Sequence, residues 1–251
     1  MPAPPAASAP PRCPSLLHAD RTDPRSRLLL AALRLFSEQG FARTSTRDLA
    51  QAAGVNLAAI RYYFGDKEGL YRATFTEAVG SLSELVPLFT PPALSLRAAL
   101  AAYFGGFTTL FKQAEGATLA RQYMRLYMRE ALDPTTFWAE EIEHDQVGPH
   151  QALVGVLRRH LRLEADDDAL HRLAFSFAGL ACSLLLQQQL IGRLRPGLLD
   201  TPEAVDAWTA QLVDGGAALV AAERRRRVAA ARARPLRPPR RSTRSTAHDA
   251  A

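Results

Sequence analysis

The residues best suited to chemistry lie between positions 44 and 71, and the chemistry they suit is contact with nucleic acid. Arginine, lysine and tyrosine side chains there could bind phosphate oxygens, and small residues would let a helix approach base edges closely. The candidate DNA-contacting residues are Thr46, Arg47, Asn56, Leu57, Ala58, Ala59, Arg61, Tyr62, Tyr63 and Lys67. We expect Arg47 and the helix start at residues 56–59 to read bases, and the others to hold phosphates.

Two short amphipathic helices around a tight turn must position these residues. Ser45 or Thr46 can cap the first helix, and Ser45 with Asp48 resembles a capping box with Asp in place of the usual Glu or Gln. Gly54 can end this helix through a left-handed conformation. Asn56 is a good cap for a second helix, Leu57 to about Tyr63. Each feature alone is common in helical proteins, but their combination predicts a helix-turn-helix.

A third helix begins beside Lys67. A cation in the first turn opposes the helix dipole and is tolerated more easily next to an anion, so Lys67 and this helix N-terminus predict a phosphate site. We expect the helix to cover residues 66–86 and to link the head to the rest of the chain. Pro87, Pro91 and Pro92 should break it.

Residues 46–70 resemble the signature of the TetR family of one-ligand transcriptional repressors. The matching positions are Thr46, Arg47, Leu49, Ala50, Ala53, Gly54, Val55, Asn56, Ile60, Tyr63, Phe64, Lys67 and Leu70. Asn56 stands where the family usually has Ser or Thr, and Arg61 substitutes a charge for its usual Tyr. The string NLAAIRYYFGDKEGLY and the segment REALDPT at 129–135 look like the CecR (CerR) branch, whose members carry a distinctive C-terminal domain.

The resemblance implies a homodimeric repressor that a small-molecule effector releases from a palindromic operator. The expected parts of the chain are a disordered leader at 1–24, a helix-turn-helix DNA-binding domain at 25–72, a helical ligand-binding and dimerisation domain at 73–222, and a basic disordered tail at 223–251. The alternative is a constitutive DNA-binding protein whose affinity is dominated by the basic tail.

Apolar periodicity independently predicts an all-α fold. A helix over 25–39 should complete a three-helix head, and body helices are expected near 95–113, 117–131, 134–163, 167–192 and 202–222. The expected head core is Leu33, Phe36, Phe41, Leu49, Val55, Ile60 and Phe64. Pro134 after Asp133 should open the helix at 134, and Gly148 with Pro149 should kink or split it.

Aromatic and methionine side chains gather at 103–128 and 137–138. Such a stripe at helical spacing is more often core than a ligand site, yet it lies where the family keeps its ligand cavity. The candidate pocket residues are Tyr103, Phe107, Phe111, Arg121, Met124, Tyr127, Met128, Trp138 and Gln187. The candidate polar anchors are Tyr103, Arg121, Tyr127 and Gln187.

The last two predicted helices carry more apolar surface than one small core should need. Their apolar residues are Leu173, Phe177, Leu180, Leu184, Leu185, Val205, Trp208, Leu212, Val213 and Leu219. Burial inside the monomer is the simple explanation. The resemblance implies a homodimer seam of four helices, two from each subunit, which we favour because a two-fold dimer presents two recognition helices to a palindromic site.

Acidic and histidine residues cluster between positions 140 and 150. The cluster is Glu140, Glu141, Glu143, His144, Asp145 and His150. Glu140 and His144 stand four apart and could hold a metal ion, but a solvated helix face explains them better, and no metal site is predicted. His160 and His171 lie among arginines and are expected to be exposed.

Composition argues against other classes of protein. The P-loop, G-x-S-x-G and G-x-G-x-x-G motifs are absent, so we expect neither an enzyme nor a cofactor. Arg, Gln or Pro interrupts each apolar run before it reaches the eighteen or so residues of a membrane span, and no signal peptide is convincing. Cys13 and Cys182 are too isolated for a disulfide or zinc framework. A cytoplasmic protein without membrane partners is therefore expected.

Charge is unevenly spread along the 251 residues. The net charge is +6, and residues 221–251 alone hold ten arginines against Glu223 and Asp249. This tail could add sequence-independent affinity for phosphates, or it could be a solvated tail without a role.

Overall fold

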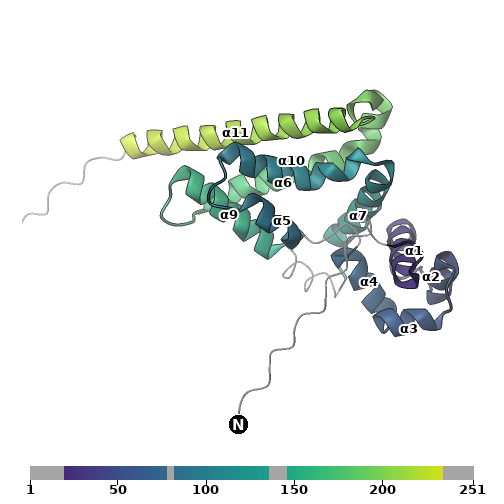
Figure 1. The fold of residues 1–251 in the computed structure, drawn as a ribbon. Helices are drawn as coiled ribbons and strands as arrows, with labels where there is room; N and C mark the ends of the chain where they lie inside the picture. Colours follow the sequence, from purple (N-terminus) through teal and green to yellow (C-terminus); the bar gives the residue numbers. More distant parts are fainter. Residues whose placement is uncertain (1–19, 78–81, 136–145, 234–251) are drawn as a thin grey trace, which may run out of the picture.

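The computed structural model describes residues 20–77, 82–135 and 146–233 (Figure 1). In this part of the chain, α-helices and two short 3-10 turns are joined by loops, and no strand occurs there. The prediction of an all-α fold is confirmed.

Four helices build the head at the N-terminal end. They are α1 (Pro24–Gln39), α2 (Thr46–Ala53), α3 (Ala58–Phe64) and α4 (Lys67–Thr76). The Asp23 carboxylate caps α1 by accepting a hydrogen bond from the Ser26 backbone N–H at 2.9 Å. Ser45 and Asp48 form the predicted capping box at the start of α2. Each cap satisfies backbone donors that have no partner inside the helix.

The head has an apolar core that the body also helps to build. At its centre, the rings of Phe36 and Tyr71 meet edge to face with centroids 4.9 Å apart. Every residue predicted for this core belongs to it, although Phe41, Val55 and Phe64 are only partly buried. Leu119 and Leu126 reach the same core from the body helix α7 (Ala114–Leu132). Figure 1 shows α7 directly beside α1.

The single helix expected over residues 66–86 is interrupted. Helix α4 ends at Thr76, and Glu77 leaves helical geometry with φ −123° and ψ −19°. The Arg25 guanidinium holds the Glu77 carboxylate through two hydrogen bonds of 2.6 and 2.9 Å, which tie the end of α4 to the start of α1. The next described helix, α5 (Leu82–Phe89), contains Pro87, so this proline does not break the helix as predicted.

The rest of the body is a layered set of helices. Beside α5 and α7 these are α6 (Leu96–Thr108), η1 (Thr109–Lys112), α9 (Val147–Leu161), α10 (Asp168–Leu194), η2 (Pro196–Leu198) and α11 (Pro202–Ala233). Helices α6 and α11 approach closely at Gly216, where an added Cβ would lie 3.2 Å from the Phe104 ring. Phe104 and Phe177 are fully buried beside it and anchor the body core.

The helix expected over 134–163 is shorter among the described residues. Pro134 and Thr135 are not helical, and α9 begins only at Val147. Gly148 and Pro149 therefore lie in its first turn and do not kink its middle. A proline is tolerated there because the first backbone N–H groups of a helix have no partner inside the helix.

Helix α11 continues well past residue 222, where a disordered tail was expected to begin. It reaches Ala233 and extends beyond α9 in Figure 1. Its extension is anchored at Arg227, which donates two hydrogen bonds of 2.7 and 2.8 Å to the Asp167 carboxylate and one of 2.6 Å to the buried Glu223. Part of the arginine run is therefore used inside the fold. The remainder of the predicted tail lies outside the described residues.

Helix α10 is long and apolar enough, by length and composition alone, to cross a membrane. This differs from the expectation that no segment qualifies, because the apolar residues around its glutamines outweigh them in mean hydropathy. One side of α10, including Ala174, Phe177 and Ala181, is buried in the body core. Such burial is typical of a core helix in a globular domain.

Candidate nucleic-acid interface and ligand cavity

The turn between α2 and α3 aims the start of α3 outward. Gly54 ends α2 in the left-handed region with φ 62° and ψ 40°, as predicted, and this conformation favours glycine. The side-chain oxygen of Asn56 accepts a hydrogen bond from the Ala58 backbone N–H at 2.9 Å, so Asn56 caps α3. Leu57 and Ala58 are exposed beside this cap, so the start of α3 is accessible to a partner.

Basic and aromatic side chains surround that helix start. Arg47 on α2 and Arg61 on α3 are exposed, and Tyr62 is the most exposed aromatic residue of the head at 82%. Ala59 and Tyr63 are partly buried and pack against the head core, and Thr46 is partly buried in the first turn of α2. The predicted DNA-contacting residues thus share one region of the head, although not all are fully exposed.

Lys67 differs from the simple phosphate site predicted for it. Its ammonium group lies over the Phe41 ring, 4.1 Å from the centroid, in a cation–π contact. The Asp66 carboxylate accepts a hydrogen bond from the Gly69 backbone N–H at 2.8 Å and so already occupies the N-terminus of α4. A DNA phosphate would find the Lys67 ammonium already held in place by the Phe41 ring. It would compete with the Asp66 carboxylate for the backbone N–H groups at the start of α4.

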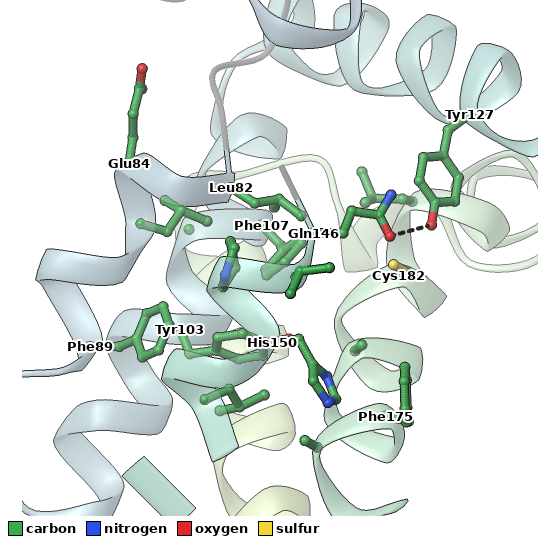
Figure 2. A pocket seen from close by; sticks show the side chains of 18 of the residues that line it. Leu82, Glu84, Phe89, Tyr103, Phe107, Tyr127, Gln146, His150, Phe175 and Cys182 are labelled. Carbon is green, nitrogen blue, oxygen red and sulfur yellow. Dashed lines mark hydrogen bonds between the residues drawn. The ribbon is translucent and has the colours of Figure 1, made fainter. Parts of the chain in front are cut away.

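A cavity of about 640 Å³ lies in the body between α5, α6, α7, α9 and α10 (Figure 2). Its wall is mostly apolar, and the polar lining residues are few, as is usual for a small-molecule site. The lining includes Glu84, Phe89, Tyr103, Phe107, Tyr123, Met124, Tyr127, Gln146, His150, His171, Phe175 and Cys182. In Figure 2, the exposed Glu84 side chain points away from the other labelled residues.

The cavity contains only some of the residues predicted for a pocket. Tyr103, Phe107, Met124 and Tyr127 line it. Phe111 and Met128 instead pack into a neighbouring apolar cluster. The predicted anchors Arg121 and Gln187 are exposed and lie outside the lining, because they occupy other faces of their helices than the lining residues do. Trp138 lies outside the described residues.

Sequence reasoning missed most of the polar groups in the cavity. His171 was expected to be exposed among arginines, but it is partly buried, and its Nδ1 lies 3.0 Å from Nε2 of His150. The Tyr127 hydroxyl donates a hydrogen bond of 3.3 Å to the side-chain oxygen of Gln146. On α10, His171, Ala174, Ala178, Cys182 and Leu185 recur at three- and four-residue spacing along the lining, a pattern that could have identified this face.

Burial shapes the acid–base properties of the wall. It is the main reason that the pKa of His150 is lowered, and the neighbouring His171 lowers it further. Burial likewise raises the pKa of the Cys182 thiol. His160, also predicted to be exposed, is partly buried, and burial lowers its pKa. The wall therefore favours neutral groups near pH 7.

The candidate metal cluster at Glu140, Glu141, Glu143, His144 and Asp145 lies outside the described residues, and His150 is its one described member. Within the described ranges, no group of three or more His, Cys, Asp or Glu side chains is arranged to hold a metal ion.

The apolar residues predicted for a dimer seam mostly face the monomer core. Leu173, Phe177, Leu184, Leu185, Val205, Leu212 and Val213 are buried, Leu180 and Trp208 are partly buried, and Leu219 is exposed. A different set of apolar residues is exposed on α10, namely Phe175, Leu186, Leu190 and Leu194. The last three are spaced by four residues and share one helix face. This exposed apolar face of α10 is a candidate interaction surface.

Comparison with known protein families decides what the head and the body are. The model for bacterial regulatory proteins of the tetR family matches residues 28–74, which contain α2 and α3. The model for the C-terminal domain of the HTH-type transcriptional dual regulator CecR matches residues 96–222, about half of the chain. This protein belongs to the TetR family. It is a DNA-binding transcriptional regulator with a CecR-type C-terminal domain, as the resemblance in its sequence predicted.

Curated relatives match only part of this TetR-family regulator. CecR of Shigella flexneri is 53% identical over 49 residues, 20% of this chain and 22% of that protein. AcrR of Shigella flexneri is 41% identical over 61 residues, 24% of this chain and 28% of that protein. BetI of Burkholderia cenocepacia strain HI2424 is 34% identical over 85 residues, 32% and 44% of the two chains. The matches thus span less than half the length of each of these relatives.

Solved structures resemble the TetR-family regulator over most of its length. HlyIIR, a hemolysin II transcriptional regulator, aligns with a TM-score of 0.54 at 21% identity, covering 78% of this chain and 98% of that one. A putative transcriptional regulator from Pseudomonas aeruginosa PAO1 aligns with a TM-score of 0.55 at 23% identity, covering 84% and 97%. At these identities, the likeness establishes the shared fold.

Proposed function

We propose that this regulator is a homodimeric repressor that leaves a palindromic operator when a small molecule occupies the cavity. The observation that carries the proposal is that one helix, α7, belongs both to the cavity wall and to the head core. A ligand in the cavity can therefore change the position of the head without touching DNA. For release, the ligand must bind one head arrangement more tightly than the other, and a coupling of roughly 1–3 kcal/mol gives about 5- to 150-fold.

The contacts of α7 support this route. Tyr123 and Tyr127 line the cavity and also pack against the head core. Further along α7, the buried carboxylate of Glu130 accepts a hydrogen bond from the hydroxyl of Tyr71 on α4. Both side chains are almost inaccessible to water, so the bond fixes α4 to α7 strongly. We propose α7, in place of the interrupted segment 66–86, as the element that transmits ligand binding.

The roles of the head residues follow from their exposure and are proposals. Arg47 and the α3 start at residues 56–59 would read base edges, where small side chains permit close approach. Thr46, Arg61, Tyr62, Tyr63 and Lys67 would hold phosphates and fix the register. We retain the head assignment at 25–72 as a proposal, with the boundary falling inside α4, and extend the proposed body from 73–222 to Ala233 because α11 ends there.

We further propose that two copies pair through α10 and α11. The exposed apolar face of α10 supports this assignment, although its residues differ from those first expected. Two-fold pairing gives two copies of α3 for successive major grooves of one operator. A protein that acts on the chromosome in this way would work in the cytoplasm, without a membrane partner.

The decisive experiment is footprinting on the promoter region of the protein's own gene, at moderate salt with excess random DNA. The full chain should be compared with a truncation after Ala233, because a cut at 222 would remove Glu223 and Arg227 from the fold. A protected palindrome that survives the truncation supports a sequence-specific head. Diffuse binding that disappears with residues 234–251 would refute the proposal and favour a constitutive protein that binds through its tail.

A further inference from the structure

The cavity wall holds a pair of histidines whose rings meet end to end. His150 on α9 and His171 on α10 place Nε2 and Nδ1 3.0 Å apart. Their ring centroids are 5.2 Å apart with an interplanar angle of 26°. The centroid separation exceeds the nitrogen separation by only 2.2 Å. This difference is about twice the distance from the centre of an imidazole ring to its nitrogen, so both nitrogens lie near the line that joins the two ring centres. The exposed Phe175 packs against His150 with centroids 4.4 Å apart.

This geometry suits a shared proton better than a metal ion. Two imidazoles on one zinc ion direct their lone pairs at a third point about 2.0–2.1 Å from each nitrogen. Here the two lone pairs point at each other across 3.0 Å, which leaves no room for an ion between them. The distance is instead that of an N–H···N hydrogen bond. One histidine is therefore the donor and the other the acceptor.

The shared bond determines what the pair can offer a ligand. It uses one nitrogen of each ring and leaves Nδ1 of His150 and Nε2 of His171, for which the described residues provide no hydrogen-bond partner. In the neutral pair, one of these nitrogens is a donor and the other an acceptor, and the two roles exchange together with the tautomers. After the pair takes up one proton, both are donors.

The charges around the cavity favour an acidic ligand. Among the described lining residues there is no lysine or arginine, and Glu84, the one carboxylate, is exposed and turned outward. The histidine pair is therefore the group in this lining that can become positively charged. An anion beside the pair would favour its protonated form and would receive charge-assisted hydrogen bonds, which are roughly twice as strong as neutral ones.

We propose that the His150–His171 pair binds a carboxylate head group on an otherwise apolar aromatic effector, and takes up a proton from solvent as the anion binds. The lowered pKa of His150 agrees with a pair that is neutral before binding. Phe89, Tyr103 and Phe107 would hold the aromatic part of the effector. This inference rests on the proposed role of the cavity as the effector site.

The test uses three aromatic probes on the full-length protein. N-phenyl-1-naphthylamine is a neutral fluorescent probe of the cavity, and 2-naphthoate and 2-naphthamide differ only in the head group. Calorimetry at pH 7.5, in two buffers of different ionisation enthalpy, counts the protons exchanged. We expect naphthoate to bind about tenfold more tightly than naphthamide. The protein should take up about one proton when naphthoate binds and none when naphthamide binds.

A double variant, His150→Gln with His171→Asn, keeps polar side chains but cannot be protonated. It should bind both naphthalene ligands equally and without proton uptake, while still binding the neutral probe. His160→Gln, on the same helix but outside the lining, is the matched control and should behave as the wild type.

The outcomes separate this inference from the proposed function. If the neutral probe does not bind the wild type, the cavity is not an effector site, and both proposals fail. If the probe binds but naphthoate shows neither preference nor proton uptake, the histidine proposal alone is overturned. Tight binding of Zn²⁺ alone, lost in the double variant, would also overturn it, because the pair would then be a metal ligand set.

Discussion

Removing the hydroxyl of Tyr71 should loosen the attachment of the head to the body. Tyr71 is buried, and its hydroxyl donates to one oxygen of the Glu130 carboxylate, while the other oxygen accepts two hydrogen bonds of 2.8 Å from Thr135. Burial is the main reason that the pKa of Tyr71 lies far above its ordinary value, so the hydroxyl remains a donor at every working pH. Tyr71→Phe would leave one carboxylate oxygen buried without a partner.

The size of the effect follows from the burial of Glu130, which is 1% exposed. A lost hydrogen bond to a buried charged group costs about 1.5–3 kcal/mol. For a chain of this size, in which 1 kcal/mol shifts Tm by about 2–4 °C, that corresponds to a decrease in Tm of roughly 3–12 °C. The ring itself is kept, so its edge-to-face contact with Phe36 should survive and contribute little to the change.

Circular dichroism during urea and thermal unfolding measures the loss, and operator binding with and without a cavity ligand measures the coupling. We expect a lower free energy of unfolding together with a weaker response of DNA binding to the ligand. Tyr62→Phe is the control for the unfolding measurement alone, since Tyr62 is a proposed phosphate contact; its side chain is 82% exposed, and its loss of a hydroxyl should change stability by less than about 0.5 kcal/mol. A Tyr71→Phe protein as stable as this control would refute the reasoning.

Three other perturbations have defined outcomes. Gly40→Ala should destabilise the fold by about 1–3 kcal/mol in denaturant unfolding, because Gly40 has φ +82° and an added Cβ would lie 2.9 Å from Arg129 Nη1; an unchanged midpoint would contradict this. The Arg227 guanidinium lowers the pKa of Asp167, so this carboxylate stabilises the fold above its unfolded pKa of about 3.9, and that stability is lost as the pH falls further. Asp167→Asn should therefore cost up to about 1 kcal/mol at pH 7, and less at pH 3; a cost that stayed constant across this range would show no linkage between the Asp167 pKa and folding. In binding titrations, Lys67→Ala should weaken binding to specific and random DNA alike and reduce the slope of log affinity against log salt by about 1. Arg47→Ala should reduce the free-energy preference for the specific sequence by about 1–3 kcal/mol. Equal losses of affinity on both DNAs for both variants would count against this division of roles.

Features fixed by neighbours in the sequence were predictable. The capping box at Ser45, the left-handed Gly54 and the cap at Asn56 each depend on groups within a few residues. Their side chains meet the same backbone groups in almost any protein that contains the pattern. The helix-turn-helix and the all-α fold could therefore be predicted from the sequence alone.

Features fixed by distant partners were not predictable. The break after Thr76 involves Arg25, 52 positions before Glu77, and the length of α11 depends on a bond between residues 60 positions apart. The histidine pair joins two helices, and the charged neighbours of His171 suggested exposure instead. In each case, a long-range contact overrides the local pattern, and only the fold brings the two partners together.

The leucines that α7 contributes to the head limit how far this regulator can be treated as a set of interchangeable parts. A chimera that joined residues 20–77 to the sensing domain of another protein would remove Leu119 and Leu126 and leave a gap in the head core. The graft would recognise its operator poorly even though every base-reading residue was intact. A biosensor design would need to include α7 with the head, or to place apolar side chains in the recipient that make the same contacts as Leu119 and Leu126.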